Sequence, residues 1–489
     1  MLFRQKQDTF IRIYRAGKDL AGAVGYIMNA ATFADRALDA SGAVFLSALS
    51  RRPKSLGEIT DYLMSAFSGA VRETVEQDAV ELFTALEQGG FIVSGETPEE
   101  LTQKDVRFSY AAITDGAAVT YGGDSNTVNP GDAKALLDRH FLEQPHLRQF
   151  QIELTSRCNE RCVHCYIPHE NKQYDIERAL YYDMLEQCRQ MGVLGLTLSG
   201  GEPLLHPDFC DFLRRAKEGD FSVNVLSNLT LLDDAVIAAM EESCLSSVQV
   251  SLYSMEASIH DAITGVPGSF YKTRAAIEKL RAHNIPLQIA CPVMKQNRDS
   301  VRSVITWAQQ NNIRPLCDYI MMARYDHSTG NLANRLDFAE TEAVIKTIMD
   351  YDEDYQQEIR RIDINHIDTE DISEMIVCGV GISSACMVAN GNIYPCAGWQ
   401  DYVCGNVRQT PLREIWEHSP RMNYLRRLRK KDFPQCLICP DRGFCSMCMV
   451  RNANENPDGN PLKINEHFCT VASLNRKVAL NWKSAQPGR

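Results

Sequence analysis

Six apolar, strand-like segments alternate with amphipathic helical segments across residues 150–330. The strand-like segments cover residues 150–154, 194–198, 221–226, 247–252, 286–290 and 314–320. Helical periodicity fills the stretches between them, for example at residues 181–191, 233–242, 271–283 and 299–312. This alternation predicts a parallel sheet with right-handed crossovers, and such sheets place their functional side chains at the carboxyl ends of the strands.

Three cysteines follow the first of these strands at a C-x3-C-x2-C spacing: Cys158, Cys162 and Cys165. Three neighbouring thiolates can bind three irons of an iron–sulfur cluster, which normally has four cysteine ligands. The remaining iron is then free to bind a small molecule and to pass it an electron. A zinc site is the alternative, but zinc usually closes with four ligands, and the other candidate nearby, His164, lies inside the spacing. The spacing therefore favours an iron–sulfur cluster with one open iron.

A Gly-Gly-Glu-Pro segment follows the second strand: Gly200, Gly201, Glu202 and Pro203. Taken with the three cysteines, this segment resembles the radical S-adenosylmethionine (SAM) superfamily. The resemblance implies an α/β fold with a partial (β/α)6 barrel, open on one side to a large substrate. It also implies that the open iron chelates the amino and carboxyl groups of SAM. Electron transfer then cleaves SAM, and a 5′-deoxyadenosyl radical abstracts a hydrogen atom from the substrate. The three cysteines would be catalytic as well as metal-binding.

The same resemblance assigns contacts with SAM to single residues. The Gly-Gly-Glu-Pro segment would bind the amino group of SAM, with both glycines letting the backbone approach a ligand closely. His164 stands where relatives carry an aromatic residue that contacts adenine. Asn228 ends the third strand, and Ser251, at the end of the fourth, would hydrogen-bond the ribose. Tyr253 departs from the family pattern, because many relatives have aspartate there.

A second group of nine cysteines lies between residues 378 and 469: Cys378, Cys386, Cys396, Cys404, Cys436, Cys439, Cys445, Cys448 and Cys469. They form a G-x4-C motif that ends at Cys396 and a C-x2-C-x5-C-x2-C motif that begins at Cys436. A zinc ribbon needs roughly 15–20 residues between its cysteine pairs, and it would leave five of these cysteines unexplained. The pattern resembles the SPASM extension of radical SAM enzymes, although the family spells the last pair C-x3-C.

The SPASM resemblance implies two auxiliary [4Fe–4S] clusters, and therefore three clusters in all. The crossed ligation of the family gives the outer cluster four ligands: Cys436, Cys439, Cys445 and Cys469. It gives the inner cluster three: Cys378, Cys396 and Cys448. The fourth ligand of the inner cluster stays open between Cys386, which is well placed, Cys404, and a thiolate of the substrate.

Residues 1–96 carry the pattern of a small winged-helix domain. Strand-like segments at residues 25–28 and 89–93 flank three helical segments, and the second helix opens with a capping box of Ser55 and Glu58. Ahead of a radical SAM barrel, this segment resembles the PqqD-like recognition element of enzymes that modify ribosomally synthesised peptides. The resemblance implies that the leader of a precursor peptide adds to the small sheet as a further strand. An ordinary winged-helix packing module is the alternative.

The predicted layout has five segments. Residues 1–96 form the recognition domain, 97–149 a linker, 150–330 the barrel, 331–377 connecting helices and 378–489 the SPASM domain. No apolar run approaches the roughly 18 residues that a membrane span needs, and the N-terminus lacks a signal-peptide core. The 17 cysteines suit metal binding in a reducing compartment better than disulfides. We therefore expect a cytoplasmic protein without membrane association, and the net charge of −12 argues against a nucleic-acid partner.

The expected function is that of a radical SAM enzyme, of oxidoreductase type, that modifies a ribosomally synthesised precursor peptide. Oxidative intramolecular crosslinking through a thioether or carbon–carbon bond is favoured, because auxiliary clusters give the second electron a path. An electron donor such as flavodoxin or ferredoxin is implied. The alternatives are a peptide epimerase with Cys291 or Cys317 as hydrogen-atom donor, a maturase of a protein subunit, and, outside enzymes, a non-catalytic iron–sulfur scaffold that binds a peptide.

Overall fold

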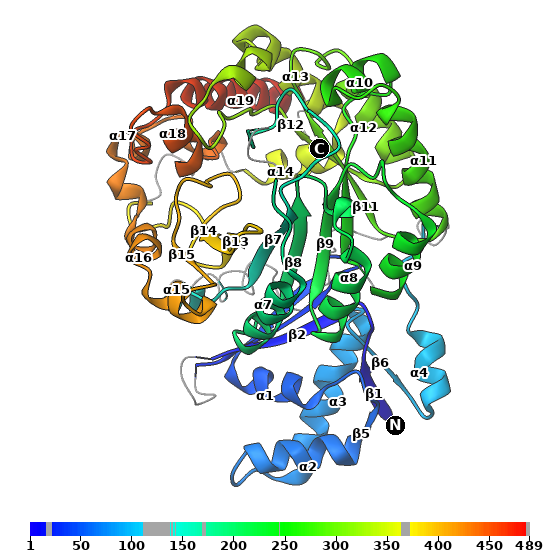
Figure 1. Ribbon diagram of the computed structural model, residues 1–489. Coiled ribbons are helices and arrows are strands. Elements are labelled where there is room, and N and C mark those ends of the chain that lie inside the picture. Colours follow the sequence, from blue (N-terminus) through cyan, green and yellow to red (C-terminus); the bar gives the residue numbers. More distant parts are fainter. Residues whose placement is uncertain are drawn as a thin grey trace.

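The chain forms a nine-stranded sheet wrapped by helices, with a smaller N-terminal module packed beneath it (Figure 1). The computed structural model describes residues 1–15, 22–110, 137, 140–141, 143–168, 173–243, 245–362 and 372–485. The strands of the large sheet follow the order β12-β11-β10-β9-β8-β7-β13-β14-β15. The six strands from β7 to β12 are the strands that the sequence predicts.

Six parallel strands form the barrel: β7 (Gln149–Thr155), β8 (Gly195–Gly200), β9 (Ser222–Ser227), β10 (Ser247–Ser251), β11 (Leu287–Pro292) and β12 (Arg314–Asp318). Each strand pairs in parallel with the next along the chain. The intervening helices are α7 (Arg178–Gln190), α8 (Phe209–Glu218), α9 (Asp234–Ser243), α10 (Ala257–Thr264), α11 (Ser269–Ala282) and α12 (Val301–Gln310), with a short turn η2 (Pro203–Leu205). The predicted α/β class with a partial (β/α)6 barrel is confirmed.

The C-terminal region extends this sheet. Strand β13 (Ser384–Met387) pairs in parallel with β7, and β14 (Asn392–Tyr394) and β15 (Gly405–Asn406) continue it antiparallel. The helices beyond the barrel are η3 (Gly330–Asn334), α13 (Phe338–Tyr351), α14 (Glu353–Arg361), α15 (Leu412–His418), α16 (Pro420–Arg427), η4 (Lys430–Asp432), α17 (Pro434–Leu437), η5 (Arg442–Phe444), α18 (Met449–Glu455) and α19 (Glu466–Ser484). The cysteine-rich region is therefore continuous with the barrel sheet and does not stand apart from it.

One apolar core explains this continuity. Phe150 and Ile152 of β7 are buried in the same cluster as Met387 of β13 and Ile393 of β14. Because side chains alternate between the two faces of a strand, these residues put one face of β7, β13 and β14 against the helix layer. The opposite face of the same strands turns toward the interior of the barrel.

The described residues of the N-terminal module form two three-stranded sheets and four helices. Its strands are β1 (Leu2–Gln5), β2 (Thr9–Tyr14), β3 (Val24–Asn29), β4 (Asp35–Leu38), β5 (Lys54–Ser55) and β6 (Ile92–Gly95). Its helices are α1 (Ala40–Ala48), α2 (Leu56–Ala66), α3 (Arg72–Gln88) and α4 (Pro98–Lys104). The predicted capping box is present, because Ser55 accepts from the Glu58 amide while the Glu58 carboxylate accepts from the Ser55 amide.

The module is fixed to the barrel through β2. Arg12 donates to the Asp220 carboxylate at 3.0 Å and to the Val193 carbonyl at 3.1 Å. Arg51 donates to the same carboxylate at 2.7 Å. Phe10 and Tyr14 are buried in a cluster that also contains Leu194, at the start of β8. In the sheet order β2-β3-β4, both β2 and β4 are edge strands. Because β2 contacts the barrel, β4 is the outer edge.

One segment differs from the sequence-based expectation. Helix α4 occupies the start of the segment 97–149 that was expected to be a linker, and most of that segment lies outside the described residues. The contacts of the module also extend past residue 96, because Arg4 of β1 pairs with Asp105 at 2.9 Å. Among the described helices, none is long and apolar enough to cross a membrane.

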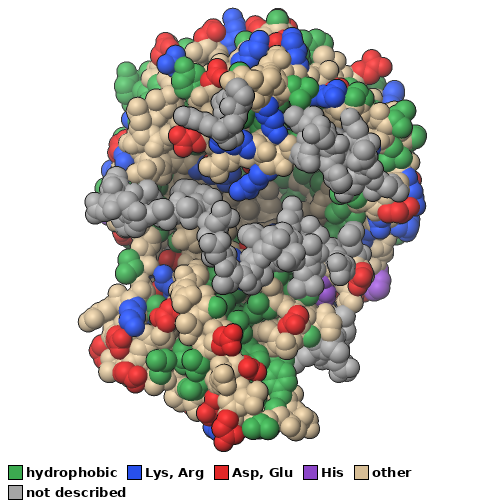
Figure 2. Space-filling model, turned by 180° about the vertical axis from the view of Figure 1, so that it is seen from behind, with side chains coloured by type: hydrophobic (Ala, Val, Ile, Leu, Met, Phe, Trp, Pro, Cys, Tyr) green, Lys and Arg blue, Asp and Glu red, His purple; other side chains and the backbone are tan. Residues whose placement is uncertain are grey.

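Acidic side chains are prominent on the module, which lies at the bottom of Figure 2. Helix α3 carries five acidic residues and a single basic one, Arg72. Phosphate backbones are bound mainly by lysine and arginine. The surface of this helix is therefore poorly suited to bind nucleic acid, although winged-helix modules often do so.

Candidate active site and iron–sulfur sites

The loop that follows β7 brings Cys158, Cys162 and Cys165 together. Burial, and then the negative charges of Glu160, Cys165 and Cys158, raise the pKa of the Cys162 thiol. Such charge coupling requires that the thiols lie close to one another. The loop is fastened to α10, because the Arg161 and Val163 amides donate to the carbonyls of Thr264 at 2.8 Å and Ile263 at 3.0 Å.

Gly200 and Gly201 pack directly against this cysteine loop. A Cβ on Gly200 would lie 2.2 Å from the Thr155 carbonyl oxygen, and one on Gly201 would lie 2.2 Å from the Arg157 carbonyl oxygen. The amides of Gly201 and Glu202 donate to these two carbonyls at 2.8 and 2.9 Å. The space on the Cβ side of both glycines is thus filled by the backbone of the cysteine loop, so that the glycines join the end of β8 to that loop. A contact between these glycines and SAM stays a prediction.

Glu202 is fully buried and joins the end of β8 to the end of β9. Its carboxylate accepts from the Ser227 hydroxyl at 2.7 Å, the Asn228 amide at 2.8 Å and the Leu204 amide at 3.0 Å. Burial raises its pKa to about 7, against the opposing effect of these three donors. The Asn228 side chain in turn donates to Asn159, inside the cysteine loop, at 3.0 Å. The Glu202 carboxylate is therefore linked to the cysteine loop through Asn228. A contact between Glu202 and SAM stays a prediction.

Tyr253, just beyond β10, reaches the cysteine loop with its hydroxyl. This hydroxyl lies 3.9 Å from the Cys162 sulfur, and the Ser251 side chain also hydrogen-bonds it. The His164 ring meets the Tyr253 ring edge-on, with 5.1 Å between their centroids. His164 and Ser251 are predicted site residues, and both contact Tyr253. Tyr253 itself is not among the predicted site residues. The signal was visible in the sequence as a tyrosine in place of the aspartate of relatives.

We expect Tyr253→Phe to lower the reduction potential of a cluster bound at this loop, by tens of millivolts in order of magnitude. A hydrogen bond to a ligand sulfur stabilises the reduced, more negative state, and its loss disfavours reduction. A redox titration of the reconstituted protein, followed by electron paramagnetic resonance (EPR), measures the change. An unchanged potential in Tyr253→Phe would show that the hydroxyl does not reach the cluster.

The C-terminal cysteines separate into two groups. The outer thiol set is defined as Cys436, Cys439, Cys445 and Cys469. Burial, and then Cys469, Cys436 and Cys439, raise the pKa of the Cys445 thiol to about 11. Burial, and then chiefly Cys439, raise the pKa of Cys469. These four thiols therefore lie together, as the SPASM resemblance implies.

The inner thiol set is defined as Cys378, Cys396 and Cys448. Burial raises the pKa of Cys396 to about 11, and Cys448 and Cys378 add to the shift. Burial and Cys448 raise the pKa of Cys378 as well. Cys386 is buried on β13, where Glu153, Cys396 and Cys404 add to the rise in its pKa. Cys386 thus lies beside one member of the inner thiol set.

The donor chemistry of these groups fits iron–sulfur clusters. Thiolates are the ligands that such clusters use, with four cysteines for a complete site and three where one iron is open. A single zinc ion would need ligand atoms that converge to within about 2.3 Å of one point. The ligand type at all three thiol groups, cysteine sulfur, therefore fits iron–sulfur clusters.

Cys291 and Cys317 face the helix layer more than the barrel interior. They lie opposite each other on β11 and β12. Cys291 is buried in the core together with Ile289, and Cys317 packs against an apolar cluster that includes Val301 and Ile305 of α12. Side chains in this layer are poorly placed to donate a hydrogen atom to a substrate in the barrel. The epimerase alternative therefore gains no support from these two thiols.

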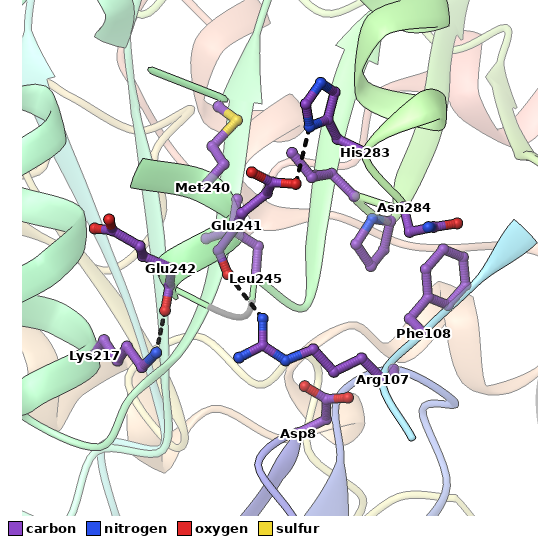
Figure 3. A pocket seen from close by; sticks show the side chains of 13 residues that line it. Asp8, Arg107, Phe108, Lys217, Met240, Glu241, Glu242, Leu245, His283 and Asn284 are labelled. Carbon is purple, nitrogen blue, oxygen red and sulfur yellow. Dashed lines mark hydrogen bonds and ion pairs between the residues drawn. The ribbon is translucent and has the colours of Figure 1, made fainter. Parts of the chain in front are cut away.

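A cavity of about 580 Å³ lies at the joint between the module and the barrel (Figure 3). Its polar groups are largely paired, since Glu241 accepts from His283 at 2.9 Å and Arg107 donates to the Glu241 carbonyl at 3.4 Å. Asp8 contributes from the module side, and Pro286 marks the amino end of β11. The cysteine loop lies at the opposite, carboxyl end of the strands. This cavity is therefore part of the joint and not of the candidate active site.

Comparison with known protein families matches two parts of the chain. Residues 152–308 match the Radical SAM superfamily, and residues 378–440 match the SPASM iron–sulfur cluster-binding domain. An AdoMet-dependent heme synthase of Methanosarcina barkeri is 25% identical over 323 residues, which cover 61% of this chain and 90% of the relative. A PqqA peptide cyclase of Gluconobacter oxydans is 25% identical over 287 residues, which cover 56% of this chain and 77% of the relative.

Solved structures with the same fold extend along nearly the whole chain. Streptococcus suis SuiB bound to S-adenosylmethionine superposes with a TM-score of 0.60 at 16% identity, covering 96% of this chain and 99% of SuiB. SuiB bound to its precursor peptide SuiA gives 0.59 at 16% identity, covering 95% and 99%. At this identity the superposition establishes the fold alone. With the two family matches, it supports a protein that contains a Radical SAM domain and a SPASM domain.

Proposed function

We propose that this chain is a peptide maturase that binds the leader of a ribosomally synthesised precursor and modifies its core by oxidative crosslinking. The observation that carries the proposal is the outer edge strand β4, on a module fixed to the barrel through β2. An extended peptide adds to such an edge through backbone hydrogen bonds. Two comparisons support a peptide substrate: one relative is named a PqqA peptide cyclase, and the SuiB structure includes a precursor peptide.

In this proposal the loop cysteines hold one [4Fe–4S] cluster, and the inner and outer thiol sets hold one each. When bound, the clusters and SAM supply one-electron chemistry, with initiation by hydrogen-atom abstraction and an acceptor for a second electron. Gly200, Gly201, Glu202 and Asn228 keep the cysteine loop in position. Cys386 stands closest to completing the inner thiol set, because it already lies beside Cys396. A flavodoxin or ferredoxin is the proposed source of electrons.

Sequence identity alone does not choose the substrate, because the heme synthase and the peptide cyclase are both 25% identical to this chain. The N-terminal module favours a peptide over a small metabolite as the substrate. A leader peptide can pair its backbone with an edge strand, whereas a small metabolite makes no use of one. A maturase of a protein subunit would use the same edge, and it differs only in the size of the partner.

The mass of a candidate precursor peptide tests the proposed reaction. We expect a loss of two hydrogens after anaerobic incubation with reconstituted enzyme, SAM and reductant, since a crosslink removes one hydrogen atom from each joined position. An unchanged mass with deuterium taken up from heavy water would instead identify an epimerase. Absence of 5′-deoxyadenosine would identify a scaffold without catalysis.

Hydrogen exchange tests the proposed leader site separately. We expect the leader peptide to slow amide exchange in β4, Asp35–Leu38, because edge amides become hydrogen-bonded when a strand is added. Protection should be weaker in β2, which already faces the barrel. Protection of other segments, with none in β4, would show that the leader does not bind to the edge of β4.

A further inference from the structure

A second hollow, of about 240 Å³, lies between the cysteine loop and the C-terminal strands. Its polar and aromatic lining comes from segments far apart in the chain: Glu153, Ser156, Tyr174, Tyr325, Tyr394 and Gln400. Ser156 is two residues from Cys158, so the hollow adjoins the candidate catalytic loop. Pockets for drug-sized ligands are usually larger, at roughly 300–1,000 Å³. A space of this size suits a single amino-acid side chain.

Strand pairing explains why these residues face one another. Cys386 of β13 lies opposite Gln151 of β7 and opposite Tyr394 of β14. Residues directly opposite in a sheet share a face, and so do residues two apart on one strand. Glu153, two residues after Gln151, therefore shares the interior face with Tyr394. The extension of the barrel sheet by β13 and β14 builds this hollow.

Among the described residues, no cationic side chain pairs with the carboxyl group of Glu153. Its side chain is 3% exposed, and within the described part of the chain its single hydrogen-bond partner is the Gln400 amide, at 2.7 Å. The described residues that line the hollow include no lysine, arginine or histidine. A buried carboxylate is costly unless it is paired. Burial accordingly raises the pKa of Glu153 to about 8, against the opposing effect of the Gln400 amide.

Three tyrosine rings surround the same space. Tyr394 is buried on β14, and its hydroxyl accepts from the Asn392 side chain at 3.1 Å. Tyr325 follows β12, and its amide donates to the Tyr166 carbonyl at 3.3 Å. Tyr174 is 58% exposed and lies at the mouth. Aromatic faces attract ammonium and guanidinium groups, most strongly when these are desolvated. A carboxyl group and several rings, with no cation among the described lining residues, form a setting for a positively charged side chain.

We propose that this hollow binds a lysine or arginine side chain of the peptide substrate, with Glu153 as the partner of its charge. The inference rests on the proposed peptide substrate and specifies which residue type is held beside the cysteine loop. Gln400 fixes one carboxylate oxygen, and the other is left for the ligand. The rings exclude water from the ion pair. Glu153 is thus a specificity residue, distinct from the thiol groups that hold the clusters.

Binding of a minimal probe tests this inference without the precursor. The probe is Nα-acetyl-lysine N-methylamide, and its neutral counterpart is Nα-acetyl-norleucine N-methylamide. Both are titrated by calorimetry into the anaerobically reconstituted full-length protein with SAM. We expect the lysine probe to bind about tenfold more tightly than the norleucine probe, as charge-assisted hydrogen bonds and cation–π contacts predict.

Two variants and a matched control complete the experiment. Glu153→Gln keeps the size of the side chain and should cost the lysine probe about tenfold in affinity. Tyr174→Leu, at the exposed mouth, leaves the buried carboxyl group in place and should weaken binding severalfold. Glu241→Gln, in the cavity at the joint, should change nothing.

Three results would overturn the inference: equal binding of both probes, no measurable binding of the lysine probe to the wild-type protein, or unchanged binding in Glu153→Gln with a normal iron content. Because neither probe carries a leader or reacts, a failed conversion of the precursor would leave this measurement unaffected. Failure of the subsite and failure of the proposed reaction are thereby distinguished.

Discussion

Replacing Cys162 by alanine is expected to abolish cleavage of SAM and to remove one cluster from the protein. Cys162 lies close to the other groups of its loop, since the charges of Glu160, Cys165 and Cys158 all raise the pKa of its thiol. Two remaining cysteines cannot hold a cluster that ordinarily uses three or four. Iron content should fall by about four atoms per chain, while the outer and inner thiol sets keep theirs. Formation of 5′-deoxyadenosine, iron analysis and EPR measure the three parts of this expectation.

Cys210→Ala is the matched control for this experiment. Cys210 is a partly exposed thiol on α8, and its sulfur lies 3.8 Å from the Ala235 carbonyl, away from the cysteine loop. We expect this variant to retain both its iron and its SAM cleavage. Retained cleavage in Cys162→Ala would disprove the assignment of the loop. An equal loss of iron in both variants would point instead to general destabilisation.

The barrel could be predicted because its signals are local. Each strand is a short apolar run, each helix has its own period, and the capping box of Ser55 and Glu58 is complete within four residues. Helix α4 carries comparable signals, with Thr97 accepting from the Glu100 amide and Pro98 in the first turn. A short helix is therefore predictable at the start of the segment 97–149, and the linker over the rest of that segment stays a prediction.

Contacts between distant segments could not be predicted in the same way. The pairing of β13 with β7 joins residues more than two hundred positions apart, and the apolar pattern of either strand fits many partners. The cysteine groups were recognisable because their spacing is itself a motif. Glu153 and Gln400 belong to no motif, and only the added strands bring them together. Residues that act through tertiary contacts alone leave no periodic trace in a sequence.

Gly200→Ala is expected to destabilise the protein strongly, because both the backbone conformation and the surrounding atoms disfavour a Cβ at this position. The backbone of Gly200 has a φ of +147°, a conformation that side chains with a Cβ rarely adopt. The added Cβ would also lie 2.2 Å from the Thr155 carbonyl oxygen, which is backbone and cannot rotate away. Strain and overpacking together should cost about 4 kcal/mol. The cysteine loop should shift away from β8, so that the first cluster is lost while the C-terminal clusters remain.

Gly57→Ala provides the contrast. Gly57 lies in α2, and the nearest atom to its added Cβ is the Ser55 side-chain oxygen at 4.0 Å. Alanine has the higher helix propensity, so this variant should be stabilised by up to about 1 kcal/mol. Thermal midpoints of the anaerobic holoproteins, with iron analysis, compare the two variants. A Gly200→Ala protein with an unchanged midpoint and full iron content would show that β8 does not support the cysteine loop. In that case the close approach of the two segments would have no structural role.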